Sequence, residues 1–283
     1  MSTASNTKVY TAGSIARRLA MENAAGEVCG AFSHAVYCTF GKEVLLLHGR
    51  EWGEVPFGIA LPDIVAFRAA VPAEVGDAVT FTADGLRIGG RLLPCTLTAP
   101  ERPAPERFTL PSAERIAAVE TYVHTHGSQG GILDYIANNR AHAAESVQTL
   151  LDAMRADDAE RASAAAVRLI GLGRGLTPSG DDYLAGFFTL LAAAEQCGMA
   201  VPRAAKACAA AVLQNLDRTS RISGAYLGNA LCGEYFTVYD RAVRALLGEG
   251  DFAAHCDFVL HMGASSGTDT LCGAVAAAKV ICL

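Results

Sequence analysis

Three kinds of signal are missing from this chain of 283 residues, and each absence excludes a class of function. No run of Lys or Arg stands out and the formal net charge is −6, which argues against nucleic acid as a partner. None of the nine cysteines forms a C-x-x-C pair. An odd, scattered set of this kind indicates small buried residues in a reducing compartment, not a disulfide framework or a zinc site.

Signals for export and for membrane insertion are also lacking. Residues 1–10 are polar and have no apolar core of a signal peptide. The longest apolar stretch, residues 183–201, is interrupted by Glu195 and Gln196, and the last one, residues 271–283, is too short to span a bilayer. We therefore expect a soluble cytoplasmic protein with no membrane partner.

Composition changes near residue 100 and predicts an α+β chain of two domains. Residues 1–105 predict a small, mostly-β domain with one helix at residues 14–21 and a Pro-rich linker at residues 99–105. Residues 106–283 predict an all-α helical bundle of about seven to nine helices, packed closely because Ala and Gly are abundant. The expected strands are residues 31–40, 44–48, 78–82, 86–88 and 91–98. The expected helices are residues 112–126, 131–155, 157–171, 180–198, 202–217, 219–231, 235–247, 251–261 and 267–281.

One pattern, S-G-x-D-x-L-x-G, occurs twice, beginning at Ser179 and at Ser266. In each copy the Ser is placed to cap a helix, and an Asp (Asp182 or Asp269) follows three residues later. A second glycine falls four residues after that Asp, on the same face of the helix. We therefore predict that the two helix starts converge on one polar site. Their carboxylates should then lie within about 12 Å of each other, the span of one small ligand bridged by hydrogen bonds.

A glycine loop, residues 171–178, precedes the first copy and reads G-L-G-R-G-L-T-P. Alternate glycines let bare backbone approach a ligand, and the helix start that follows favours an anion or an electronegative oxygen. The loop is neither a dinucleotide fingerprint nor a Walker loop, because a helix precedes it and no Gly-Lys-Ser/Thr follows. The alternative is a tight turn between two helices with a double-acid cap.

Further candidates come from hydroxyl groups and one histidine. Hydroxyls at helix starts could contact a carboxylate or a phosphate, although simple capping explains them equally well. His34, beside Ser33 in a predicted strand, could face the glycine loop as a proton donor or acceptor; the alternative is a His satisfied within its own sheet. The candidate catalytic residues are Asp182, Asp269 and His34. The candidate substrate-binding residues are Gly173, Arg174, Gly175, Thr177, Ser179, Gly180, Asp181, Ser220, Ser265, Ser266 and Gly267.

At residues 171–182 the sequence resembles a bacterial family labelled as a domain of unknown function, whose hallmark is G-L-G-x-G-L-T-P-S-G-D-D. A later S-S-G-x-D segment at residues 265–269 and the early Ser33-His34 pair match that family as well. One member looks like the small subunit of oxamate carbamoyltransferase, which acts with larger partner subunits in anaerobic allantoin and purine breakdown. That enzyme converts oxalurate and phosphate to oxamate and carbamoyl phosphate.

The resemblance implies a transferase subunit that binds a small ureido or carboxylate metabolite. The S-T-R-T-R phosphate motif of ordinary carbamoyltransferases is absent, which argues against their fold and site layout. Carboxylates beside an anionic ligand repel it unless donors or a cation intervene, and Mg²⁺ between Asp181, Asp182 and Asp269 would remove that repulsion. Two alternatives stay open. One is a Mg²⁺-dependent hydrolase whose Asp residues hold the metal, and the other is a non-catalytic subunit that only binds a ligand.

Overall fold

The computed structural model describes residues 8–100, 111–234, 236–248 and 251–282. The chain divides into two compact units, Met1–Pro103 and Ala104–Leu283. Most of the predicted Pro-rich linker, residues 101–105, lies outside the described residues, and so does the first residue of the helix expected at 235–247.

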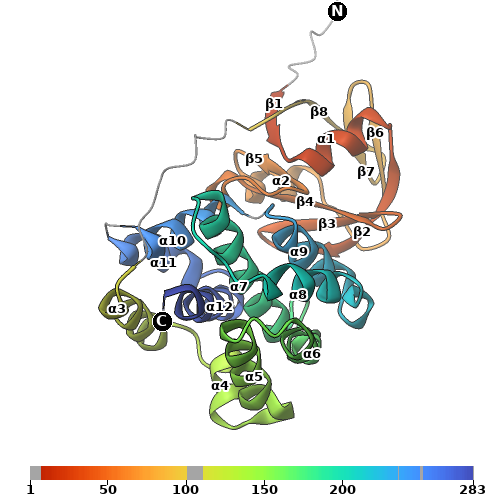
Figure 1. Ribbon diagram of the computed structural model, residues 1–283. Coiled ribbons are helices and arrows are strands. Elements are labelled where there is room, and N and C mark those ends of the chain that lie inside the picture. The colour runs from red at the N-terminus through yellow and green to blue at the C-terminus, as the bar shows by residue number, and fades with distance from the viewer. Residues whose placement is uncertain (1–7, 101–110, 235, 249–250, 283) are drawn as a thin grey trace, which may run out of the picture. The chain divides into compact units, whose positions relative to one another are not determined.

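The first unit is a closed barrel of eight strands (Figure 1). The order around the barrel is β1-β5-β4-β3-β2-β6-β7-β8, and β1 closes it by pairing with both β5 and β8. The pairs β4–β5 and β1–β8 are parallel and the others are antiparallel. Closure leaves no unpaired sheet edge. The strands are β1 (Lys8–Ala12), β2 (Ala25–Ala31), β3 (Ala35–Phe40), β4 (Glu43–Gly49), β5 (Gly58–Leu61), β6 (Ala78–Thr82), β7 (Gly85–Ile88) and β8 (Arg91–Thr98).

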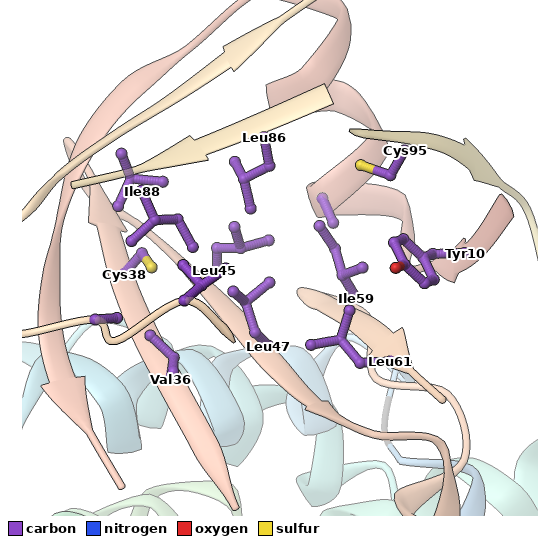
Figure 2. Close-up of a cluster of buried hydrophobic side chains, with 14 of the residues drawn as sticks. Tyr10, Val36, Cys38, Leu45, Leu47, Ile59, Leu61, Leu86, Ile88 and Cys95 are labelled. Carbon is purple, nitrogen blue, oxygen red and sulfur yellow. The ribbon is translucent and has the colours of Figure 1, made fainter. Parts of the chain in front are cut away.

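Apolar side chains from alternate strand positions fill the barrel interior (Figure 2). Leu45 and Leu47 of β4 and Ile59 of β5 are fully buried there. Helices α1 (Ser14–Met21) and α2 (Ile64–Ala70) add buried side chains to the same cluster. The helix predicted at residues 14–21 is therefore confirmed, and it packs on strands β4, β5 and β6.

The strand predicted at residues 31–40 is wrong in one place that affects the candidate site. Strand β2 ends at Ala31 and β3 begins at Ala35, with a bend between them. His34 lies on that bend and is exposed, so it does not belong to a strand. Strand β2 was predicted only at its last residue, Ala31, and strands β1 and β5, which close the barrel, were not predicted.

The second unit is built around two long helices, α7 and α12, which pack along each other (Figure 1). Helix α7 also contacts α4, α6, α9 and α10, while α12 also contacts α3, α4, α5, α10 and α11. The helices are α3 (Ala113–His126), α4 (Ile132–Ala137), α5 (Ala143–Arg155), α6 (Ala159–Leu169), α7 (Ser179–Gln196), α8 (Ala204–Leu213), α9 (Arg221–Leu231), α10 (Thr237–Leu247), α11 (Phe252–Leu260) and α12 (Ser266–Cys282), with 3-10 turns η2 (Arg140–His142) and η3 (Leu216–Arg218). A further 3-10 turn, η1 (Arg50–Trp52), belongs to the first unit.

The predicted fold class, a small mostly-β domain followed by an all-α helical bundle, is corrected in both parts. The β part is a closed eight-stranded barrel. The helices do not form a simple bundle, because members of a bundle each keep one exposed face, whereas α7 and α12 are buried along nearly their whole length. The broad α+β composition remains.

The central helix pair approaches closely because each helix sets a glycine against the backbone of the other. A Cβ on Gly186 would lie 1.8 Å from the carbonyl oxygen of Thr270, and a Cβ on Gly273 would lie 1.8 Å from that of Tyr183. In both contacts the eighth residue of one motif meets the fifth residue of the other. The pair therefore has an approximate twofold symmetry, and the two motif starts lie at the same end of it.

Candidate functional site

The first motif begins α7 in a different way from that predicted. Pro178, not Ser179, precedes the helix, and no side chain caps it. Ser179 is the first helical residue, and its hydroxyl contacts the carboxylate of Asp269 in the second motif. The hydroxyl of Ser266, the equivalent residue, contacts the carboxylate of Asp182. Each serine therefore contacts the aspartate of the other helix, and the two motifs form one polar cluster.

Asp182 is the least satisfied member of this cluster. It is 7% exposed, and its Oδ2 atom is buried with no hydrogen-bond partner among the described residues. Burial raises the pKa of Asp182 well above its usual range; the carboxylate of Asp269 adds to the rise, and the hydroxyls of Ser266 and Thr177 oppose it. Those two hydroxyls bond to each other at 2.9 Å. Burial therefore opposes ionisation of Asp182, which lies beside these two hydroxyls.

Asp269 is the equivalent residue of the second motif, and both of its carboxylate oxygens accept hydrogen bonds from the chain. Its Oδ1 accepts a hydrogen bond from the N–H of Ile132 at 2.6 Å, and its Oδ2 accepts one from Ser265 Oγ at 3.0 Å. A Cβ on Gly131 would lie 2.2 Å from Oδ1, so a glycine is needed for the start of α4 to approach. Burial raises the pKa of Asp269 and its donors oppose the rise. This carboxylate fastens α4 to α12.

Asp181 has a similar holding role on the other side of α7. Its carboxylate accepts hydrogen bonds from the N–H of Gly171 at 2.8 Å, from Ser223 Oγ at 2.7 Å and from the hydroxyl of Thr219. It is 1% exposed, and burial raises its pKa while the three donors lower it. Asp181 therefore fixes the glycine loop and the start of α9 against α7.

The glycine loop is held at its ends and open in its middle. Gly171, Gly173 and Gly175 have φ of +74°, +126° and +99°, a region that L side chains rarely adopt. Ser220 Oγ donates to the carbonyl of Leu176 at 2.5 Å and accepts from the N–H of Ser223 at 3.0 Å. In the described part of the chain, the N–H groups of residues 173–177 donate to no protein atom. The loop therefore presents a run of N–H groups that have no partner among the described residues, and its Thr177 contacts Asp182.

A comparison with known families bears directly on this region. Residues 169–278 match the family model "oxamate carbamoyltransferase subunit AllH". The AllH match begins at the last residue of α6, contains the glycine loop and both motifs, and ends within α12. It covers less than half of the chain. No curated protein and no solved structure matched the chain.

The AllH match contains Asp181, Asp182 and Asp269 but not the start of α4, which holds Asp269. Two of the predicted substrate-binding glycines lie at buried helix starts and use their N–H groups internally. Gly180 donates to the carbonyl of Leu172 and Gly267 to that of Met262, so these N–H groups are not available to a ligand. Arg174 is exposed on the loop.

The sequence left open a Mg²⁺ ion held between Asp181, Asp182 and Asp269. Among the described residues, no group of three or more His, Cys, Asp or Glu side chains is placed to hold a metal ion. Asp181 and Asp269 already accept N–H and O–H donors, which explains why they do not turn toward Asp182 as ligands. No helix among the described residues is long and apolar enough to cross a membrane.

His34 belongs to the first unit, and the prediction that it faces the glycine loop stays a prediction. A different histidine of that unit, His48 on β4, was not predicted and is fully buried. Its Nδ1 lies 2.8 Å from the carbonyl oxygen of Gly49, and its Nε2 has no partner among the described residues. Burial lowers the pKa of His48 to about 4. Nothing in its sequence context, an apolar strand, distinguishes it from a core residue.

Proposed function

We propose that this chain is a subunit of a carbamoyltransferase whose α7–α12 start binds a small ureido or carboxylate metabolite of the oxalurate and oxamate type. The AllH match, which covers both motifs, supports the transferase assignment. The observation that carries the binding site is Asp182, a buried carboxyl group whose Oδ2 is unpartnered beside the hydroxyls of Thr177 and Ser266.

An unsatisfied buried polar group costs on the order of 1–3 kcal/mol, so a ligand that donates to Asp182 Oδ2 would recover part of that cost. A ureido or amide N–H of the ligand can donate to Asp182 Oδ2. The hydroxyls of Thr177 and Ser266 can donate to its carbonyl or carboxylate oxygens. Because burial favours the protonated form of Asp182, the site does not repel an anionic ligand as an ionised carboxylate would.

The implied reaction requires a proton on the leaving nitrogen. A phosphate oxygen forms a bond to the carbamoyl carbon of oxalurate, and the bond from that carbon to the oxamate nitrogen breaks. The leaving nitrogen takes up a proton, and the attacking hydrogen phosphate loses one, so charge and atoms balance. A protonated Asp182 can give its proton to the nitrogen and regain one from the phosphate, which is the role of a general acid.

The test is a calorimetric titration of the full chain with oxalurate and with oxamate, followed by an assay for carbamoyl phosphate after adding the partner subunits. Asp182→Asn keeps the shape but cannot exchange a proton, so we expect a loss of activity on the order of 100-fold. Unchanged binding and an unchanged rate would overturn the proposal. Lost binding with an unchanged rate would make the chain a ligand-binding subunit only.

A further inference from the structure

The duplication extends beyond the two motifs into the turns that precede them. Before the first motif, the N–H of Leu172 donates to the carbonyl of Leu169 at 3.1 Å. Before the second, the N–H of Met262 donates to the carbonyl of Val259 at 2.9 Å. The turn after α6 and the turn after α11 therefore correspond residue by residue.

The two turns also match in their next hydrogen bond and in the glycine that follows it. The N–H of Gly180 donates to Leu172 at 2.8 Å, and that of Gly267 donates to Met262 at 3.1 Å. The next residue in each turn is a glycine of positive φ, Gly173 or Gly263. A Cβ on either glycine would lie 3.3 Å from the Cβ of its motif serine. The two helical hairpins, α6–α7 and α11–α12, are thus built on one plan.

The two hairpins differ in the length of one segment. Five residues, 174–178, connect Gly173 to Ser179, whereas only two, 264–265, connect Gly263 to Ser266. The first hairpin therefore carries three additional residues. The longer connection places the Thr177 hydroxyl on Ser266 and beside Asp182, and its residues include Arg174, which forms no ion pair with any described residue.

We propose that this longer connection binds the oxyanion of the ligand, a carboxylate or a phosphate, through the main-chain N–H groups of residues 173–177. The inference rests on the proposed function, because it concerns the same site. Successive N–H groups around glycines of positive φ form concavities that bind anions. The independent sign of a ligand is Asp182 Oδ2, which is buried with no partner among the described residues, and Thr177 of this segment contacts the same carboxyl group.

The proposal can be tested by shortening the first hairpin to the length of the second. Deleting residues 174–176 leaves Thr177 and Pro178 between Gly173 and Ser179, which is the length at which the second hairpin already closes. We would titrate the wild type, this deletion and Arg174→Ala with phosphate alone and with oxamate alone. The deletion should weaken binding of the anion at least about tenfold, the scale of one lost charge-assisted hydrogen bond. Arg174→Ala should weaken it less, because the N–H groups remain.

The two arms identify the anion: loss of phosphate binding alone assigns the segment to phosphate, and loss of oxamate binding alone assigns it to the carboxylate. Wild-type affinity of the deletion for both anions would overturn the inference, while the proposed function stands if Asp182→Asn still loses oxamate. A wild type that binds neither anion overturns both. Phosphate binding that needs the segment, without oxamate binding or carbamoyl transfer, keeps the inference and overturns the proposed function.

Should the deletion fail to fold, Gly175→Ala decides. Gly175 has a φ of +99° and no atom within 4 Å of an added Cβ, so alanine disturbs the backbone of the segment without a clash. We expect anion affinity to fall several-fold in a folded protein. Unchanged affinity in this variant would overturn the inference.

Discussion

Both units contain ionisable side chains with a buried polar atom that has no partner among the described residues: Arg68 and His48 in the first unit, and Asp182 and Tyr183 in the second. His48, through its Nε2, and Asp182, through its Oδ2, make the closest comparison. Burial favours the neutral form of both, because it lowers the pKa of His48 to about 4 and raises that of Asp182. By burial alone the two residues would be equal candidates for a functional site.

Their surroundings separate them. The His48 ring stacks on Trp52 with centroids 5.9 Å apart, and even a Cβ on Gly58 would come within 2.6 Å of Nε2. Asp182 instead lies beside two hydroxyls and next to the glycine loop, where the N–H groups of residues 173–177 donate to no atom of the described residues. An unpartnered buried atom therefore indicates a binding site only where other groups beside it are free to reach the same ligand.

The largest effect should come from the close contact on which the helical unit depends. Gly273→Ala places a Cβ 1.8 Å from the backbone of Tyr183, so α7 and α12 must separate. We expect a loss of about 3 kcal/mol or more in the free energy of unfolding, measured with urea.

Gly224→Ala is the matched control, and it should not lower the free energy of unfolding. Gly224 also lies within a helix, α9, but its nearest contact to an added Cβ is 3.6 Å away. Gly224→Ala should therefore leave stability unchanged or raise it by up to about 1 kcal/mol, the helix propensity of alanine. A similar loss in both variants would show that the α7–α12 contact is not special.

Acid should act on the two units in opposite directions. The pKa of His48 is lowered from 6.5 to about 4, so its stabilising neutral state is fully present above 6.5 and is lost as pH falls toward 4, by about 3 kcal/mol in total. The raised pKa values of Asp181, Asp182 and Asp269 contribute stability at low pH that is lost as pH rises.

The single tryptophan makes this measurable, because Trp52 fluorescence reports the barrel and circular dichroism reports the helices. His48→Phe keeps a ring against Trp52 and should remove the loss of barrel stability between pH 6.5 and 4. The same acid sensitivity in that variant would show that another group titrates. Ligand binding should not change in it.

The two equivalent aspartates should differ in stability as well. Asp269→Asn removes an acceptor from Ile132 or Ser265 and should cost about 2 kcal/mol, the range for hydrogen bonds to charged groups. Asp182→Asn removes a buried carboxyl group whose Oδ2 has no partner among the described residues, and it should leave stability unchanged or raise it by about 1 kcal/mol. Equal losses in urea unfolding would contradict the different roles assigned to the two residues.

Much of the local structure could be predicted from the sequence, but the closure of the barrel could not. Helix α3 is capped by Ser112 and ends before Gly127, as predicted, because capping depends on neighbouring residues. Strand β1 pairs with β5 and β8, which are far away in the chain. Such pairings leave no periodic signal, and both β1 and β5 are short.

The close packing of the two motif helices could be predicted because, in each motif, the last glycine lies on the same helix face as the aspartate. Their different roles could not. Asp182 and Asp269 occupy the same position in identical patterns, and only the tertiary structure brings Ile132 to one and leaves the other unpartnered. For the same reason the sequence could not show that the helix-start hydroxyls of Thr219 and Ser223 hold Asp181 and not a ligand.

The most direct test of Asp182 as the ligand-binding carboxyl group combines two measurements on one preparation of the Asp182→Asn variant. Oxamate affinity is measured by calorimetry and the free energy of unfolding by urea titration. We predict that affinity falls on the order of 100-fold, about 2.7 kcal/mol, while the free energy of unfolding stays equal or rises. Wild-type affinity in the folded variant, or a loss of affinity explained by unfolding, would contradict the account.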